Sequence, residues 1–230
     1  MFMTTLYKEG LYLKEDIINS FNRIALLDDK WDHNQHYEKL LISEISNSDG
    51  NALDIGCGTG EFTQKLSKKV KSVYGIDLSP VMVEEAMKRH SEENIQYSIQ
   101  DFDELNEEMK YDFIVSIATF HHLNLETALP KIERLLKRNG KLIVLDLYER
   151  KGFIDRFLDC IAVPINHVLK ALKNVRSVDT EEAAAWKEHS HLDEYMTYKE
   201  LSNVYHKFLS RDVKIKRLLF WRYVLVYKKR

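Results

Sequence analysis

The chain has 230 residues, 44% of them apolar and 30% charged, which are the proportions of a soluble globular protein. This length suits one domain with elaborations, and a formal net charge of −2 gives no attraction toward nucleic acid or an anionic membrane. The two cysteines, Cys57 and Cys160, are too few for a disulfide framework or a cysteine zinc cluster.

The N-terminal residues show no apolar core of a signal peptide, because charged residues recur from Lys8 to Asp16. The most apolar long stretch, residues 153–172, contains charged side chains and is interrupted by Pro164, so we do not expect it to span a bilayer. We therefore expect a cytoplasmic protein without a membrane partner.

Apolar residues with helix-type spacing over residues 11–46 predict a helical region near the N-terminus. Beyond it, short apolar runs alternate with amphipathic segments. Runs of Ile, Val and Leu without polar alternation are typical of strands buried on both faces, and strands that alternate with helices predict βαβ units around a parallel sheet. The predicted strands of this part are residues 51–55, 72–77, 95–99, 111–117 and 141–147.

Local signals predict where several helices begin or end. The pair Ser79-Pro80 is typical of an N-cap followed by the first helical residue. Residues 197–200 have the form of a capping box, before a helix that extends through Phe208. The pair Asn139-Gly140 predicts the end of a helix just before the fifth strand.

Residues 148–196 have a helical pattern without a strand, and we interpret them as an insertion at the carboxyl-end rim of the sheet, where ligands bind in open α/β folds. Residues 213–220 and 223–229 are strand-like runs whose short link permits only an antiparallel hairpin. The sequence thus predicts one α/β domain with a Rossmann-like, doubly wound sheet of seven strands, mostly parallel, with an antiparallel strand in the C-terminal hairpin. Its expected parts are an N-terminal helical cap (1–48), a cofactor-binding core (49–147), a helical insertion or lid (148–196), and a final helix with the hairpin (197–230).

The stretch NALDIGCGTGEF, residues 51–62, places three glycines at every second position after an apolar run. A dinucleotide fingerprint requires a third glycine at the position of Glu61, and a Walker loop requires a lysine that does not follow, so neither phosphate-binding motif is present. The addition of Asp54, two residues before Gly56, makes the loop more specific than a bare glycine-rich turn.

The segment LDIGCGTGEF resembles the first motif of class I S-adenosylmethionine-dependent methyltransferases. The segments YGIDLSP, IQDFDEL, YDFIVSIATFHHL and LLKRNGKLIVLDLY resemble the later motifs in the same order, and LLFWRYVLVYKK resembles the C-terminus of one branch of the family. The resemblance covers roughly residues 30–150 and 196–230. One departure is Arg138-Asn139-Gly140, where family members commonly have Pro-Gly-Gly.

The resemblance implies S-adenosyl-L-methionine as cofactor, with S-adenosyl-L-homocysteine as the product. It implies that Asp77 accepts from the ribose hydroxyls, that Asp101 accepts from the adenine amino group, and that the glycines let the backbone approach the amino acid end. The cofactor-binding residues predicted in this way are Asp54, Gly56, Cys57, Gly58, Gly60, Asp77, Leu78, Met82, Asp101, Phe102 and Ile117.

Simpler roles exist for several of these residues. Asp77 can cap the helix that starts at Pro80, although Ser79 already suits that place. Asp101 can be a solvated acid. Asp54 can order the loop, and Cys57 is a small packing residue, because methyl transfer needs no thiol nucleophile.

The candidate catalytic residues are His121 and His122 after the fourth strand and His36 and Tyr37 in the N-terminal region. A histidine can act as a base near neutral pH. The alternatives are that the two adjacent histidines only position the backbone, and that Tyr37, like Trp31, anchors its helix to the sheet.

We expect no metal. His189 and His191 lie near Glu188 and Asp193 in the sequence, but these residues form no compact ligand pattern.

The resulting hypothesis is a methyltransferase that transfers a methyl group to a small-molecule acceptor by in-line displacement, as a monomer or homodimer. The alternatives are a tRNA or protein methyltransferase, and a non-catalytic adenosylmethionine-binding protein of the same fold. We do not expect nucleic acid as a partner. Apolar residues of the insertion suggest an acceptor with a hydrophobic portion, although core packing explains them equally: Phe153, Phe157, Ile161, Val163 and Trp186.

Overall fold

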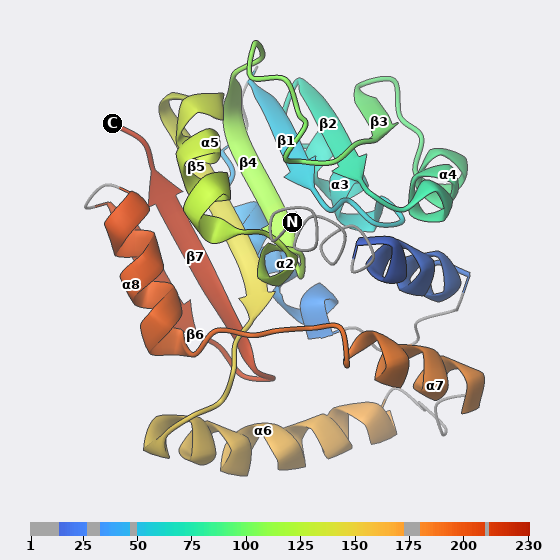
Figure 1. Cartoon of the computed structure of the whole chain (residues 1–230), viewed down its shortest axis with the longest axis vertical. Helices are drawn as coiled ribbons and strands as arrows, with labels where there is room; N and C mark the ends of the chain where they lie inside the picture. The colour runs from blue at the N-terminus through green and yellow to red at the C-terminus, as the bar shows by residue number, and fades with distance from the viewer. Residues whose placement is uncertain (1–13, 27–32, 47–49, 173–179, 210–211) are drawn as a thin grey trace, which may run out of the picture.

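The computed structural model describes residues 14–26, 33–46, 50–172, 180–209 and 212–230. In this part of the chain, seven strands form one sheet in the order β3-β2-β1-β4-β5-β7-β6 (Figure 1). The strands are β1 (Asn51–Ile55), β2 (Ser72–Asp77), β3 (Ile95–Ile99), β4 (Tyr111–Ile117), β5 (Leu136–Leu147), β6 (Val213–Arg217) and β7 (Arg222–Lys228). The predicted Rossmann-like, doubly wound fold is confirmed.

The first five strands pair in parallel, and β7 pairs antiparallel with both β5 and β6. The single reversed strand is therefore β7, as the short hairpin link predicts. The strand order reverses between β1 and β4, which is the point of an open α/β sheet where ligands bind at the carboxyl ends of the strands.

The helices lie on both faces of the sheet and beyond the carboxyl ends of its parallel strands (Figure 1). Residues 14–24 form the first described helix. The others are α2 (His33–Ser43), α3 (Glu61–Ser67), α4 (Pro80–Arg89), α5 (Leu125–Leu135), α6 (Phe153–Leu172), α7 (Thr180–His189), α8 (Tyr198–Phe208) and the short 3-10 helix η1 (Phe120–His122).

Two of the predicted helix starts are confirmed by their caps. The Ser79 side chain accepts a hydrogen bond from the Met82 amide, with Pro80 as the first residue of α4. Thr197 and Glu200 form a reciprocal capping box at the start of α8, which ends at Phe208.

The predicted role of Asn139-Gly140 is wrong. Helix α5 already ends at Leu135, and the pair lies inside β5, where Asn139 has a positive φ of 65°. The Asn139 amide donates to the Lys229 carbonyl and the Lys229 amide donates to the Gly140 carbonyl, so both residues belong to the sheet. A Cβ at Gly140 would lie 2.9 Å from the Lys137 carbonyl oxygen, so this irregular part of β5 requires glycine.

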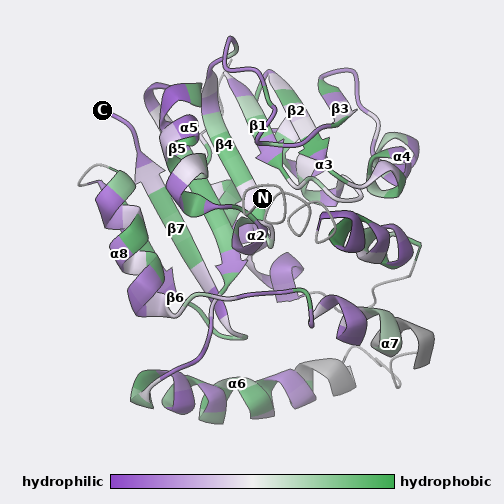
Figure 2. Cartoon of the chain, in the orientation of Figure 1, coloured by the Kyte–Doolittle hydropathy of each residue, from purple (hydrophilic) through white to green (hydrophobic). Residues whose placement is uncertain are grey.

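Two apolar clusters cover the two faces of the sheet. One joins α5 and α8 to the sheet, and the other joins α2 and α3 to it. Figure 2 shows hydrophobic strands beneath helices that carry both hydrophobic and hydrophilic residues. No helix in the described ranges combines the length and the apolar character that crossing a membrane requires.

We expect the interior of the sheet to dominate stability. Ile114, in the central strand β4, is 0% exposed, whereas Ile99, in the edge strand β3, is 57% exposed. Replacement Ile114→Ala should lower the free energy of unfolding by about 2–5 kcal/mol, because it leaves a cavity that the neighbouring strands cannot fill.

The matched replacement Ile99→Ala should change stability by about 0.5 kcal/mol or less, because the side chain is largely hydrated in the native state. Urea denaturation of both variants measures the difference. Equal losses would contradict the assignment of β4 to the centre and β3 to the edge.

Candidate functional site

A cavity of about 450 Å³ lies at the carboxyl ends of β1, β2 and β4. All the predicted cofactor-binding residues except Gly60 line it. The opposite wall comes from the helix of residues 14–24, from α2 and from α7, which carry Ile17, Phe21, Ile24, Gln35, Glu38 and Trp186. Elements far apart in the sequence thus enclose the glycine-rich loop.

The three loop glycines have different reasons to be glycine, although all have positive φ angles, of 72°, 51° and 84° for Gly56, Gly58 and Gly60. A Cβ at Gly56 would lie 2.0 Å from the Thr119 hydroxyl, and one at Gly60 would lie 2.6 Å from the Tyr97 hydroxyl. At Gly58 the nearest atom is the Met82 sulfur at 3.9 Å. Gly56 and Gly60 therefore permit close packing, whereas Gly58 leaves open space beside the cavity.

Asp77 holds the glycine loop to the end of β2. The Gly58 amide donates to one carboxylate oxygen at 3.0 Å, and the Ser79 amide donates to the other at 2.8 Å. Burial raises the pKa of the Asp77 carboxyl, against the opposing effect of these hydrogen bonds. Since Ser79 caps α4, Asp77 is not the cap. When ionised, the Asp77 carboxylate retains lone pairs that can accept further hydrogen bonds from the cavity side.

Asp54 lies beneath the loop and is almost completely buried. The Thr63 hydroxyl, in α3, donates to its carboxylate at 2.6 Å. Burial raises the pKa of Asp54 to about 7, and the charge of Asp77 adds to this effect. Asp54 therefore connects β1 to α3 and orders the loop between them.

Asp101 and Phe102 form the far end of the cavity. The Lys14 ammonium donates to the Asp101 carboxylate at 2.6 Å, an ion pair across 87 residues that sequence reasoning missed. Phe102 is buried, and its carbonyl accepts from the Lys131 ammonium at 2.8 Å. The N-terminal helix is thus fastened to the loop after β3.

His36 and Tyr37 do not line the cavity. The Tyr37 hydroxyl donates to the Leu219 carbonyl at 3.0 Å, and the His36 ring packs edge-on against Phe220. Both side chains therefore contact the turn of the C-terminal hairpin, while Gln35, on the same helix, faces the cavity. Trp31 lies outside the described residues.

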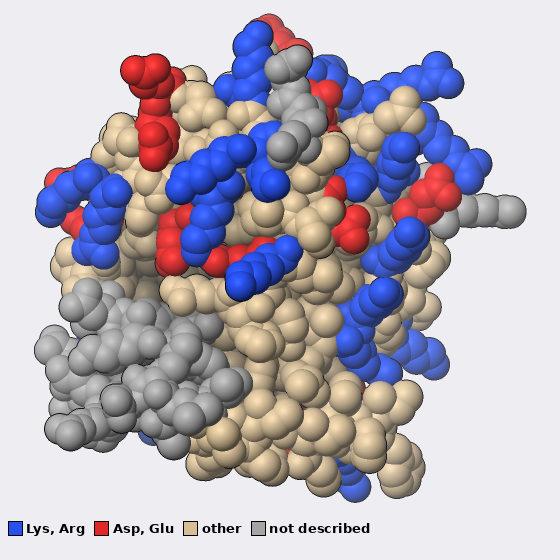
Figure 3. All heavy atoms as spheres, turned by 180° about the vertical axis from the view of Figure 1, so that it is seen from behind, with Lys and Arg blue, Asp and Glu red and all other residues tan. Residues whose placement is uncertain are grey.

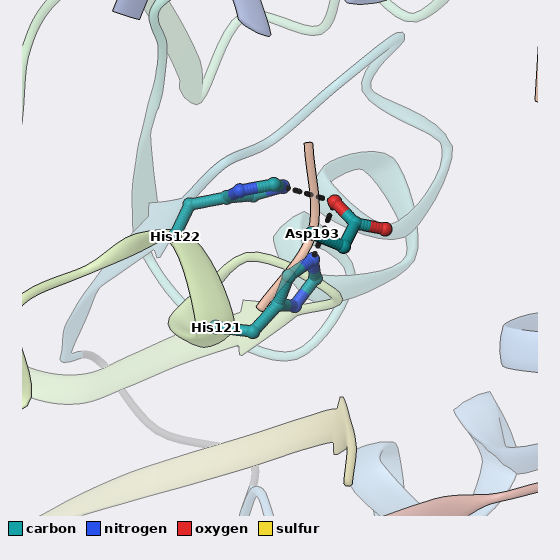
Figure 4. Close-up of side chains that lie close together, drawn as sticks. All are labelled: His121, His122 and Asp193. Carbon is teal, nitrogen blue, oxygen red and sulfur yellow. Dashed lines mark ion pairs between the residues drawn. The ribbon is translucent and has the colours of Figure 1, made fainter. Parts of the chain in front are cut away.

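His121 and His122 occupy η1 and have different environments. The His121 ring nitrogen Nδ1 lies 2.7 Å from the buried Asp146 carboxylate, whereas His122 lines the cavity. Burial opposes the charge on His121, but Asp146 and Asp193 raise its pKa to about 9. Burial lowers the pKa of His122 to about 4. Figure 4 shows both rings directed at Asp193, which follows α7.

The five apolar residues singled out in the insertion 148–196 differ in whether they face the cavity. Trp186 of α7 lines it, whereas Phe153 and Phe157 of α6 are 89% and 67% exposed. Ile161 and Val163 are also exposed. These four α6 residues therefore neither line the cavity nor belong to the core, the two roles considered for them from the sequence. A second hollow, of about 750 Å³ between the end of β5 and α6, contains none of the predicted site residues.

Comparisons with known proteins find similarity in the core of the chain. Residues 53–144 match the family model for a methyltransferase domain. A malonyl-[acyl-carrier protein] O-methyltransferase of Priestia megaterium is 39% identical over 110 residues, which cover 45% of this chain and 40% of that protein. The chain spans less than two thirds of the length of the curated relatives that it matches.

Two solved structures share the fold. The N-methyltransferase NodS of Bradyrhizobium japonicum, in complex with S-adenosyl-L-homocysteine, is 16% identical with a TM-score of 0.61, over 93% of this chain and 98% of its own. The magnesium protoporphyrin IX methyltransferase ChlM of Synechocystis, with the same bound compound, is 16% identical with a TM-score of 0.60, over 95% of this chain and 100% of its own. The family resemblance predicted from the motifs is confirmed.

The buried Asp54 should make stability depend on pH. Its pKa rises from 3.8 to about 7 on folding, so its contribution to stability is present below 3.8 and is lost as the pH rises through 7. As the pH rises between these two values, the unfolding free energy of Asp54→Asn should therefore gain up to about 1.4 kcal/mol per pH unit relative to that of wild type.

Urea denaturation of both proteins at intervals from pH 4 to pH 8 measures this gain. The control Asp212→Asn, which removes an exposed carboxylate paired with Arg230, should show no such increase. Parallel stability curves for wild type and Asp54→Asn would show that Asp54 stays ionised in the folded protein.

Proposed function

We propose that this chain, whose residues 53–144 belong to the methyltransferase-domain family, transfers a methyl group from S-adenosyl-L-methionine to a small-molecule acceptor. One observation carries the proposal. A single cavity brings together the glycine loop after β1, Asp77 at the end of β2 and Asp101 after β3, which are the positions that the family motifs assign to the cofactor.

The residues around this cavity suit the cofactor. The open space beside Gly58 permits a ligand to touch the backbone, and the Asp77 carboxylate can accept from a ribose diol. A volume of about 450 Å³ falls within the range of small-molecule sites. The cofactor supplies an electrophilic methyl group with a thioether leaving group. The protein has to bind the cofactor and the acceptor, orient them toward each other and exclude water.

The charge of the lining supports a cofactor without phosphate and an acceptor other than nucleic acid. The cations of the lining are Lys14 and Arg89, whereas its carboxyl groups are those of Glu38, Asp54, Glu61, Asp77, Asp101 and Asp103. An acidic cavity repels a phosphate backbone. On the face seen in Figure 3, acidic residues lie among the basic ones in the upper half, and the central part of the lower half shows neither.

The proposed character of the acceptor follows from the cavity wall opposite the glycine loop. Ile17, Phe21 and Ile24 of the N-terminal helix and Trp186 of α7 are apolar or aromatic. They suit an acceptor with a hydrophobic portion, and in this proposal the N-terminal cap and α7 act as its cover. Of the four proposed catalytic side chains, His122 is the one that lines the cavity.

Binding of S-adenosyl-L-homocysteine tests the cofactor assignment. Calorimetric titration of wild type should give saturable binding, and NAD and ATP should give none. The replacement Asp77→Asn should weaken binding about 10- to 100-fold, because hydrogen bonds to a charged group contribute about 1.5–3 kcal/mol.

The control Asp212→Asn makes the same chemical change far from the cavity and should bind as wild type does. Circular dichroism of each variant establishes that it is folded. Absence of binding by folded wild type would overturn the proposed function.

A transfer assay with a radiolabelled methyl donor separates the acceptor classes. Label should enter small molecules with an apolar portion, and neither tRNA nor protein. With an acceptor found in this way, Trp186→Ala should lower kcat/KM about tenfold or more, because the side chain lines the cavity. Phe157→Ala, at an exposed position, should leave it unchanged, and equal effects would contradict the assigned wall.

A further inference from the structure

Four side chains from two distant segments converge beside the cavity. His121 and His122 follow β4, and His189 and Asp193 lie at the end of α7 and just after it. The Nε2 atoms of the three histidines lie 3.7, 3.7 and 3.5 Å from the same Asp193 oxygen, Oδ1. The dashed lines of Figure 4 mark two of these contacts.

In three of these four side chains, the polar atom that points away from the shared Asp193 oxygen contacts another residue. His121 Nδ1 lies 2.7 Å from Asp146 Oδ1, and His189 Nδ1 lies 3.0 Å from the Ser20 hydroxyl. The Tyr195 hydroxyl donates to the second oxygen of Asp193 at 2.5 Å. Metal-binding histidines are commonly oriented in this way, with one ring nitrogen on a carboxylate or hydroxyl and the other on the ion.

The three histidine Nε2 atoms and Asp193 Oδ1, by contrast, are not hydrogen-bonded to one another. Among the described residues, His122 Nε2 and Asp193 Oδ1 are buried polar atoms without a hydrogen-bond partner. Burying such atoms unpaired is costly, so a missing partner is the simplest explanation. If an ordinary imidazolium–carboxylate pair explained the cluster, the contact should be as short as that of His121 with Asp146, which is 2.7 Å.

The separations suit ligands around one small cation. Zinc bonds nitrogen and oxygen ligands at about 2.0–2.2 Å, which in a tetrahedron sets neighbouring ligand atoms about 3.4 Å apart. The ligand atoms of His121, His122 and Asp193 all lie within 4.8 Å of one another. The carboxylates of Asp146 and Asp193 are 1% and 5% exposed, and a divalent cation would balance their two negative charges.

We propose that His121 Nε2, His122 Nε2 and Asp193 Oδ1 bind a divalent cation of the zinc type, as three protein ligands that leave the fourth position to water. Imidazole-rich sites select zinc-like metals over magnesium or calcium, which prefer oxygen ligands. The proposal departs from the sequence-based expectation of no metal. It does not depend on methyl transfer.

The consequence of such a site is a cross-link between two segments of the chain. It would tie the segment after α7 to the loop after β4, at the edge of the cavity that His122 lines. The ion would thus hold the helical insertion against the sheet. Because an ion that binds only the folded chain stabilises it, zinc should raise Tm and a chelator should lower it.

The test uses the full chain expressed without an oligohistidine tag. Elemental analysis after dialysis should find about one zinc per chain, and cobalt added to metal-free protein should give the visible absorption of a four-coordinate site. His122→Gln and Asp193→Asn should each abolish stoichiometric binding. Asp146→Asn, which replaces the carboxylate that orients the His121 ring, should weaken zinc binding about 10- to 100-fold.

His191→Ala and His206→Ala replace exposed histidines outside the cluster and should bind zinc as wild type does. Circular dichroism identifies variants that fail to fold, and the wild-type measurements remain decisive in that case. Folded wild type that binds neither zinc nor cobalt at one equivalent would overturn the proposal. So would an Asp193→Asn variant that binds zinc as tightly as wild type.

Discussion

The carboxylate of Asp77 is the interaction on which the shape of the cavity depends. Its two oxygens accept from the amides of Gly58 and Ser79, so one side chain joins the end of β2 to the loop after β1 and to the start of α4. The parallel pairing of β1 with β2 brings these segments together. A buried carboxylate without those amides would be costly, and the glycine loop would lose its fixed position.

The cover of the cavity depends on contacts between segments that are far apart in the chain. Lys14 pairs with Asp101, and Ser20 bonds to His189, so the N-terminal helix is held both to the sheet and to α7. The ring of Phe21 packs against His189 and His122. The N-terminal helix and α7 therefore support each other. An ion bound by His121, His122 and Asp193 would further hold α7 in place.

Sequence reasoning succeeded where the signal is local and failed where packing decides the outcome. The caps at Ser79 and Thr197 depend on residues three positions away, and both were predicted correctly. The pair Asn139-Gly140 also looks like a local signal, but its conformation is used inside β5, because β7 pairs with that strand. His36 and Gln35 are neighbours on one helix, and only the docking of α2 decides that Gln35 faces the cavity.

The sequence by itself determined the succession of strands and helices along the chain, the reversed hairpin strand and the motif residues that line the cavity. These follow from hydrophobic periodicity, glycine spacing and acidic residues at strand ends, all of which act over a few positions. Only the tertiary structure decided that α7 rather than α6 closes the cavity, and that His121 and His122 meet Asp193. Contacts between segments some seventy residues apart leave no periodic trace in one sequence, because they depend on how whole elements pack.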